Sequence, residues 1–426
     1  MPSTRPERHI AIVGGGIIGA ASLYYLAQHS TASASAPLLR LTLIEEAKQV
    51  APGASGKSGG FLAEDWHGAD TADLAKLSYR LHRELAERED GRARWGYRAV
   101  ETVSLAFDDS KRRAKCPPEL DWLAAEHVSS ASSMGGSGTT AQVTPLALVQ
   151  HLVAAASKES NVEVRLATRA QHVTVNDAGH INGLVVRDST GEQTLAVDDV
   201  VVAAGPWTGK LLTSLLPPGL AVPSFYRNAS RITGSRAHSI VVQSPKPTSA
   251  HCLFTDMHYG RQAGAPEVYC REDGTIYACG GSDDVPLPAS ADEVTHDGEQ
   301  TRTLIAQMEH LSPSHLSAAA GAKVTKQQAC YLPVAPRGPT IAGDDRLGLY
   351  VAAGHSCWAS RSAWERARWC RKWCWARCRV QTLALYGDGI AQVGCVFKSP
   401  RARPAHCQTC LNPARSQTQT DTAGPA

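Results

Sequence analysis

The chain has 426 residues, 43% of them hydrophobic, and a formal net charge of +3. This length and apolar content predict a globular protein with a sizeable core and two interleaved domains. No stretch approaches the roughly 20 apolar residues of a membrane span, and the polar start of the chain lacks the apolar region of a secretory signal. We therefore expect a cytoplasmic protein without a membrane span.

The first predicted elements are a strand, a tight turn, a helix and a second strand. The apolar run 9–13 breaks into a glycine-rich motif at 14–19, residues 20–28 follow with helical periodicity, and residues 39–45 form the next apolar run. Within the motif, Gly14 suits the turn, Gly16 lets the backbone approach a pyrophosphate, and Gly19 permits close helix packing. The order predicts a nucleotide-binding unit; a chance cluster of glycines in a turn is the alternative.

A carboxylate at the end of the second strand indicates which nucleotide the unit binds. Glu45, or less favourably Glu46, is placed to bind ribose hydroxyls and would repel a 2′-phosphate, which disfavours NADP. Glu45 lies further along than the about 20 residues usually expected. The polar insert 30–37 accounts for the extra length.

The remaining elements follow two patterns. Before residue 224 we predict a loop at 53–60, helices at 70–89 and 146–158, a flexible stretch at 129–140, and strands at 162–166, 172–175, 181–187 and 200–204. From 224 to 331, separated strands and one helix at 292–310 predict a largely antiparallel domain, after which 347–353 returns to a buried-strand pattern.

Several motifs, in order and spacing, resemble the D-amino acid oxidase superfamily of FAD-dependent oxidoreductases. Residues 53–60 are similar to its second flavin loop, although a flexible linker is the alternative for that segment alone. Residues 141–145 resemble its turn before a long helix, and 200–208 its strand that ends in Ala-Gly-Pro-Trp. Residues 354–358 resemble its last flavin motif, and the segments at 234–241 and 266–275 resemble substrate strands of a fungal-type branch.

The resemblance implies an α/β fold with a Rossmann-like FAD-binding domain interleaved with a mainly antiparallel α+β substrate domain. The FAD-binding domain would comprise 8–66, 135–220 and 330–358, and the substrate domain 67–134 and 221–329. The residues that it implies for FAD binding are Gly14, Gly16, Ile17, Ile18, Gly19, Glu45, Glu46, Ser55, Gly56, Ser58, Gly59, Gly60, Ala204, Gly205, Trp207, Cys330, Gly354 and His355.

The implied activity is the oxidation of a small amine or amino acid by hydride transfer to flavin N5, with oxygen or another acceptor taking the electrons. The candidates for catalysis and substrate binding are Lys57, Arg236, His238, Tyr269 and Arg271, since guanidinium and hydroxyl groups suit a carboxylate. Cys330 matches a site of covalent flavin attachment in some relatives, but a small buried cysteine is the alternative, and we expect non-covalent FAD.

Two other functions stay open at this stage. One is a non-catalytic protein that keeps the fold and acts through protein contacts, for example in intracellular trafficking. The other is an NAD-dependent dehydrogenase, which would not need the additional flavin motifs.

The composition changes after Trp358. From residue 359 onward 11 Lys and Arg stand against 3 Asp and Glu, and 7 of the 12 cysteines lie between 357 and 410. The expected glycine-opened helix is missing, and Trp, Cys and Arg occur together without amphipathic order, as in an out-of-frame translation. We predict an aberrant or disordered basic tail at 359–426, without a metal or nucleic-acid module, which would weaken FAD binding or inactivate the protein.

Overall fold

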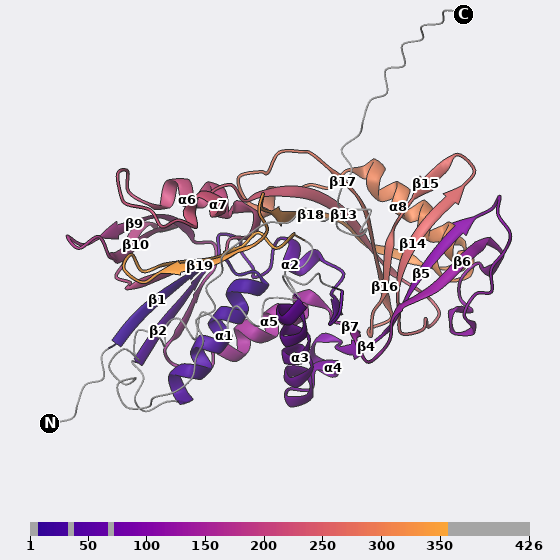
Figure 1. The fold of residues 1–426 in the computed structure, drawn as a ribbon, viewed down its shortest axis with the longest axis horizontal. Coiled ribbons are helices and arrows are strands. Elements are labelled where there is room, and N and C mark those ends of the chain that lie inside the picture. The colour runs from indigo at the N-terminus through magenta and orange to yellow at the C-terminus, as the bar shows by residue number, and fades with distance from the viewer. Residues whose placement is uncertain (1–6, 33–37, 67–71, 357–426) are drawn as a thin grey trace, which may run out of the picture. The chain divides into compact units, whose positions relative to one another are not determined.

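The computed structural model describes residues 7–32, 38–66 and 72–356, which all fall within one compact unit (Figure 1). The predicted basic tail lies outside the described residues. None of the described helices is long and apolar enough to cross a membrane.

A mostly parallel sheet contains the strand–turn–helix–strand unit that the sequence predicts. Within the described part of the chain its strands run in the order β19-β20-β12-β1-β2-β8, and β19 alone is antiparallel to its neighbour. The strands are β1 (Glu7–Val13), β2 (Leu38–Ile44), β8 (Val162–Arg165), β12 (Asp199–Val202), β19 (Thr340–Asp344) and β20 (Leu349–Ala353).

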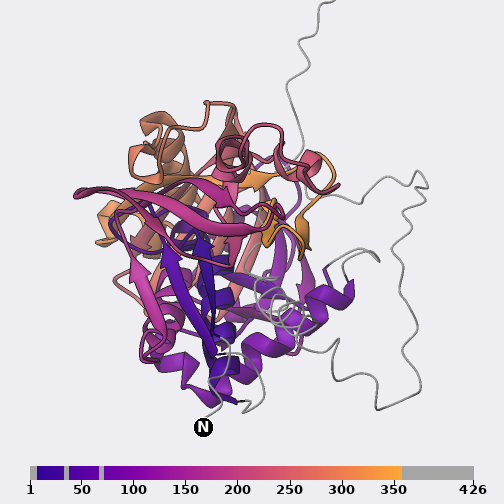
Figure 2. The same cartoon turned by 90° about the vertical axis from the view of Figure 1, so that its left-hand side faces the viewer.

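This sheet is covered on both faces, because successive side chains of a strand point to opposite sides. Ile10 and Ile12 pack with the helices α1 (Ile17–Ala32) and α5 (Pro145–Ala156). Ala11 and Val13 belong to the opposite core, with α6 and the small sheet β11-β10-β9, which lies across the parallel strands (Figure 2). The covering elements are α6 (Thr208–Leu215), β9 (Arg169–Val175), β10 (Ile181–Asp188) and β11 (Gly191–Leu195).

The second large sheet is mainly antiparallel. Its order is β18-β13-β17-β16-β14-β5-β6 with β15 beside β14, and its one parallel pair among the described strands is β5 with β14. Helix α8 (Gly298–Leu311) covers one face, where Leu304 and Met308 join the sheet's core. The strands are β5 (Glu101–Asp108), β6 (Val128–Gly135), β13 (Thr233–Gln243), β14 (His251–Tyr259), β15 (Gln262–Gly264), β16 (Glu267–Cys270), β17 (Thr275–Asp283) and β18 (Lys323–Val334).

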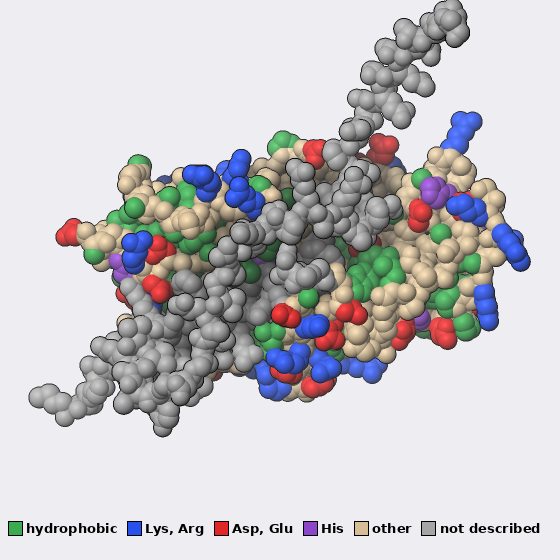
Figure 3. Space-filling view, viewed as in Figure 1, with side chains coloured by type: hydrophobic (Ala, Val, Ile, Leu, Met, Phe, Trp, Pro, Cys, Tyr) green, Lys and Arg blue, Asp and Glu red, His purple; other side chains and the backbone are tan. Residues whose placement is uncertain are grey.

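The remaining described elements are a small sheet and several helices. They include the small sheet β3-β7-β4 and α3, which carries the i,i+4 ion pairs Arg80–Glu84 and Arg83–Glu87. Acidic and basic side chains intersperse on the surface in the region of α3 (Figure 3). The bounds are β3 (Phe61–Ala63), β4 (Arg98–Ala99), β7 (Thr140–Gln142), α2 (Ala54–Lys57), α3 (Ala72–Arg88), α4 (Gly91–Trp95), α7 (Tyr226–Ala229), α9 (Pro313–Leu316), η1 (Pro118–Leu120), η2 (Ala125–His127), η3 (Gly205–Trp207), η4 (Ala291–Glu293) and η5 (Ala318–Ala320).

Two local predictions were wrong. The stretch 129–140, predicted flexible, contains most of β6, because its serines pair with β5 along the edge of the sheet. The helix predicted over 292–310 is interrupted: after η4 the chain restarts as α8, because the Asp297 side chain accepts hydrogen bonds from the backbone N–H groups of Glu299 (2.7 Å) and Gln300 (3.3 Å).

The predicted fold class is confirmed, with a parallel sheet covered by helices and a second, mainly antiparallel sheet. The parallel sheet collects strands from 7–44, 162–202 and 340–353, while most of the second sheet comes from 101–135 and 233–334. On this basis we keep the discontinuous domain boundaries as a proposal.

Candidate FAD and substrate site

A cavity lies at the carboxyl ends of β1, β2 and β12, the edge at which open α/β sheets bind ligands. It holds about 1020 Å³ of empty space, part of it open to solvent. The residues predicted for FAD binding that line it are Gly14, Gly16, Ile17, Ile18, Glu45, Glu46, Ser55, Ala204, Gly205, Trp207 and His355. The segments that carry them are far apart in the sequence, and the fold brings them to one place.

The glycine-rich turn after β1 is possible only without side chains. Gly14 has φ +110°, and a Cβ there would lie 2.4 Å from the Ala203 carbonyl oxygen. A Cβ on Gly19 would lie 1.8 Å from the Gly14 oxygen, so α1 packs directly on the turn. Ser55 accepts a hydrogen bond from the Ile17 backbone N–H at 3.0 Å and lies beside Gly16. Gly19 therefore does not line the cavity but allows α1 to pack against the turn that does.

The structure separates the two acidic candidates. Glu45 is 8% exposed, and its carboxylate accepts hydrogen bonds from the backbone N–H groups of Gly15 (2.7 Å) and Ala47 (2.9 Å). Burial raises the pKa of Glu45, and these two hydrogen bonds oppose the shift. Glu46 is exposed and forms a surface ion pair with Arg169. Glu45 is thus the carboxylate held rigidly at the end of β2.

The cavity has the chemistry that FAD requires. It combines a glycine-lined wall that backbone amides can use for phosphate with one buried, fixed carboxylate. His355 is buried, lines the same cavity, and has a buried Nε2 without a hydrogen-bond partner in the part of the chain that the structure describes. An unpaired buried nitrogen is costly unless a ligand satisfies it. These residues fit a flavin dinucleotide.

The first residues of the second glycine loop line this cavity, whereas residues 56–60 lie outside the lining, and Gly59 contacts the antiparallel sheet. A Cβ on Gly59 would lie 2.1 Å from the Tyr269 ring, and Gly60 has φ +85° with the Val143 oxygen 2.0 Å from a Cβ position. A Cβ on Gly56 would likewise lie 2.2 Å from the Ala51 oxygen. Gly354, also outside the lining, has φ +85°. The loop therefore fits closely between the two large sheets.

Hydrogen bonds fix the loop to strand β18 and to Arg271, the residue directly after β16. Arg271 donates to the Ser58 carbonyl oxygen (3.1 Å), and Gln328 donates to that of Lys57 (3.2 Å). The Lys57 ammonium in turn donates to the Ala329 carbonyl oxygen at 3.2 Å, beside Cys330. Three of the predicted residues, Lys57, Arg271 and Cys330, are thus brought together around the loop.

Aromatic rings line the same side of the loop. Tyr269 is stacked between Phe61 and Tyr277, with ring centroids 5.8 Å apart in both pairs, and its hydroxyl donates to Glu267. The Arg271 guanidinium lies 5.1 Å from the centroid of the Tyr277 ring. Tyr269 and Arg271 therefore stay our candidates for the substrate side of the site.

The other two substrate candidates form a separate network. Arg236 donates two hydrogen bonds to Asp283 (2.8 and 2.7 Å) and one to the Thr295 carbonyl oxygen (3.0 Å). His238 Nε2 accepts from the Asp297 backbone N–H at 3.0 Å, and burial lowers the pKa of His238. Both side chains are occupied in fixing the start of α8, and a substrate role for them stays a prediction.

Replacing Arg236 with leucine is expected to destabilise the chain by about 3 kcal/mol, because Asp283 would keep a charge without its partner. Hydrogen bonding to Arg236 holds the pKa of Asp283 below its ordinary value. The pair's stabilisation is therefore complete above the pKa of an unfolded aspartate and disappears as the pH falls through the lower folded value. Urea unfolding at neutral and acidic pH measures both effects.

The matched control for this variant is Arg187→Leu, which breaks the surface pair with Glu192. Its effect should stay within about 1 kcal/mol. If Arg236 acted only as a substrate clamp, the Arg236→Leu chain would keep its unfolding free energy and show only a raised KM.

Sequence reasoning missed part of the cavity wall. The start of β9 contributes residues 168–170, and the segment before α2 contributes residues 51 and 52. Leu211 of α6, Ala291 and Pro333 also line it. No local motif marks these residues, since they reach the site through the packing of distant elements.

Comparisons with known proteins identify the family of the chain. The family model described as FAD dependent oxidoreductase (DAO) matches residues 9–373. A Schizosaccharomyces pombe protein described as an oxidoreductase is 33% identical over 370 residues, which cover 83% of this chain and 90% of the relative. Another protein described as an oxidoreductase, from Saccharomyces cerevisiae, is 26% identical over 500 residues, which cover 85% of this chain and 91% of the relative. These relatives confirm the fungal-type branch.

The fold is shared with a solved structure of an oxidase. Glycine oxidase from Bacillus cereus matches with a TM-score of 0.66 and 16% identity, covering 87% of this chain and 95% of that chain. With the family model matching most of the residues and the predicted FAD cavity formed at the ends of the parallel strands, the chain belongs to the FAD-dependent oxidoreductase (DAO) family.

Proposed function

We propose that this FAD-dependent oxidoreductase oxidises a small amine or amino acid. The observation that carries the proposal is the contact between the second glycine loop and strand β16, where Tyr269 packs on Gly59 and Arg271 binds the Ser58 carbonyl. A guanidinium and aromatic rings thereby lie beside the predicted flavin loop. The fold shared with glycine oxidase supports the same substrate class.

Each residue of the site has a defined task in this proposal. Gly14, Gly16 and Glu45 hold the nucleotide, and Ser55 fixes the turn at the start of α1. FAD, when bound, supplies the hydride acceptor at N5. Arg271, whose buried Nε has no hydrogen-bond partner within the described ranges, is suited to a substrate carboxylate, and the rings around it exclude water.

The test is anaerobic mixing of the purified, FAD-containing chain with glycine, N-methylglycine, proline, other L- and D-amino acids, and amines without a carboxylate. We expect at least one amine or amino acid to bleach the flavin absorption, and carboxylate-free analogues to bind more weakly. Oxygen consumption and dye reduction then distinguish oxygen from another electron acceptor. A chain that holds FAD but is reduced by none of these compounds would contradict the proposal.

We also propose that FAD is held without a covalent bond. Burial raises the pKa of the Cys330 thiol to about 11, so the nucleophilic thiolate is scarce at neutral pH. Acid precipitation should therefore release the flavin into the supernatant, and Cys330→Ser should keep the flavin content of the wild type. Flavin that stays in the wild-type pellet and leaves the Cys330→Ser pellet would show attachment at Cys330.

Lys57 is proposed to supply positive charge to the flavin site. Burial lowers the pKa of Lys57, and the Ala329 carbonyl oxygen orients its ammonium group. Lys57→Met should slow flavin reoxidation by oxygen about tenfold, equivalent to about 1.4 kcal/mol of electrostatic stabilisation. Stopped-flow measurement of the two half-reactions tests this, with Lys76→Met as a surface control. Equal reoxidation rates in Lys57→Met and the wild type would exclude the role.

A further inference from the structure

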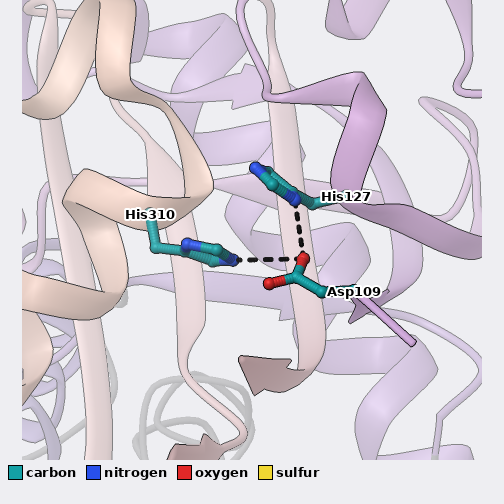
Figure 4. Close-up of side chains that lie close together, drawn as sticks. All are labelled: Asp109, His127 and His310. Carbon is teal, nitrogen blue, oxygen red and sulfur yellow. Dashed lines mark ion pairs between the residues drawn. The ribbon is translucent and has the colours of Figure 1, made fainter. Parts of the chain in front are cut away.

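Three side chains that the proposed reaction does not use converge at one end of the antiparallel sheet (Figure 4). Asp109 follows β5, His127 ends η2, and His310 lies in the last turn of α8. One ligand atom from each lies within 4.8 Å of the others. None of the three lines the nucleotide cavity.

The three side chains point toward a common centre. His127 Nδ1 lies 2.6 Å from Asp109 Oδ1, and His310 Nε2 lies 4.0 Å from the same oxygen (Figure 4). Tetrahedral zinc with bonds of about 2.0–2.2 Å separates its ligand atoms by roughly 3.3 Å. The two distances fall on either side of that value, and all three ligand atoms lie within 4.8 Å of one another, a spacing close to that of ligands around one ion.

His310 provides a second, independent observation. Its Nε2 is buried and has no hydrogen-bond partner among the described residues, because 4.0 Å to Asp109 is too long for a hydrogen bond. The ring is held by stacking on Tyr259 (4.3 Å between centroids) and by contact with His127 (4.6 Å). A fixed ring with an unpaired nitrogen aimed at a carboxylate has the arrangement of a metal ligand.

We propose that Asp109, His127 and His310 bind one divalent transition-metal ion, with Zn²⁺ as the best match. Two imidazoles and one carboxylate favour zinc over magnesium or calcium, which prefer all-oxygen sites. The site is partly exposed, with side-chain exposures of 42%, 32% and 19%, so water can complete the coordination. The ion would join the end of α8 to the connection between β5 and β6.

The test uses the full, FAD-containing chain, stripped with a chelator and treated with a thiol-blocking reagent because the chain has 12 cysteines. Isothermal titration with Zn²⁺ should show one site in the wild type. His310→Phe keeps an aromatic ring against Tyr259 but removes the nitrogen, and should weaken that site by more than about 100-fold. Co²⁺ absorption at wavelengths beyond the flavin bands should appear in the wild type and not in His310→Phe.

The matched control is His258→Phe, because His258 forms a similar pair with Asp256 (3.1 Å) but belongs to no three-ligand group among the described residues. It should bind Zn²⁺ like the wild type. Circular dichroism and the flavin spectrum check folding, and Asp109→Asn, at an exposed position, serves if His310→Phe does not fold. Equal Zn²⁺ affinity and stoichiometry in the wild type and the folded site variant, or no zinc binding to the thiol-blocked wild type, would overturn the proposal.

Discussion

The chain with Gly14→Ala is expected to purify without FAD. Alanine at φ +110° is strained, and its Cβ would lie 2.4 Å from the Ala203 carbonyl oxygen at the end of β12. Neither atom can move easily, because β1 and β12 are hydrogen-bonded neighbours in the centre of the parallel sheet. The turn must then shift into the space that we assign to the pyrophosphate. We expect a rise in the FAD dissociation constant of at least about 100-fold, equivalent to about 2.7 kcal/mol.

The ratio of flavin to protein absorbance, followed by titration of the apoprotein with FAD, measures this loss. Gly138→Ala is the matched control, because a Cβ there meets nothing within 4 Å and the residue does not have the left-handed backbone of Gly14. It should retain wild-type flavin. A Gly14→Ala chain with wild-type FAD affinity would show that the turn is not the pyrophosphate site.

The nucleotide end of the site could be predicted because local chemistry determines it. The turn after β1 has no room for side chains and therefore requires glycine at positions 14 and 19. Strand β2 is a short apolar run, and Glu45 follows it directly at the edge of the sheet. Both features are visible in a few consecutive residues. The cavity accordingly is lined by Gly14, Gly16, Ile17 and Ile18 of the glycine motif, with Gly19 packed behind the turn, and by Glu45, Ser55 and the Ala-Gly-Pro-Trp turn.

The substrate side could not be predicted to the same depth, because alternation along a strand does not reveal which partner a side chain meets. Arg236 and Arg271 looked equivalent in the sequence, yet Arg236 is paired with Asp283 and Arg271 binds the flavin loop. Similarly, the serine-rich β6 has weak strand signals of its own and depends on β5 for its hydrogen bonds. Tertiary packing determines which partner each of these side chains and strands has.

The second large effect is expected from Glu45→Gln. The two carboxylate oxygens of Glu45 accept from the N–H groups of Gly15 and Ala47. Glutamine can replace only one of these acceptors, and its amide N–H₂ would face the other donor. The variant thereby loses a charged acceptor for the ribose hydroxyls and misplaces the turn that Gly15 belongs to. Hydrogen bonds to charged groups contribute about 1.5–3 kcal/mol, so we expect FAD affinity to fall about 100-fold.

Glu46→Gln is the matched control, because it makes the same substitution at the neighbouring position, where the carboxylate is exposed instead of buried. Glu46 is exposed and its ion pair with Arg169 is at the surface, so FAD affinity should change by less than about fivefold, or about 1 kcal/mol. Fluorescence titration of both apoproteins with FAD gives the comparison. If Glu46→Gln lowered FAD affinity more than Glu45→Gln, the exposed Glu46 would be the residue that contacts the nucleotide. The buried Glu45 carboxylate would then only hold the turn between β2 and the flavin loop.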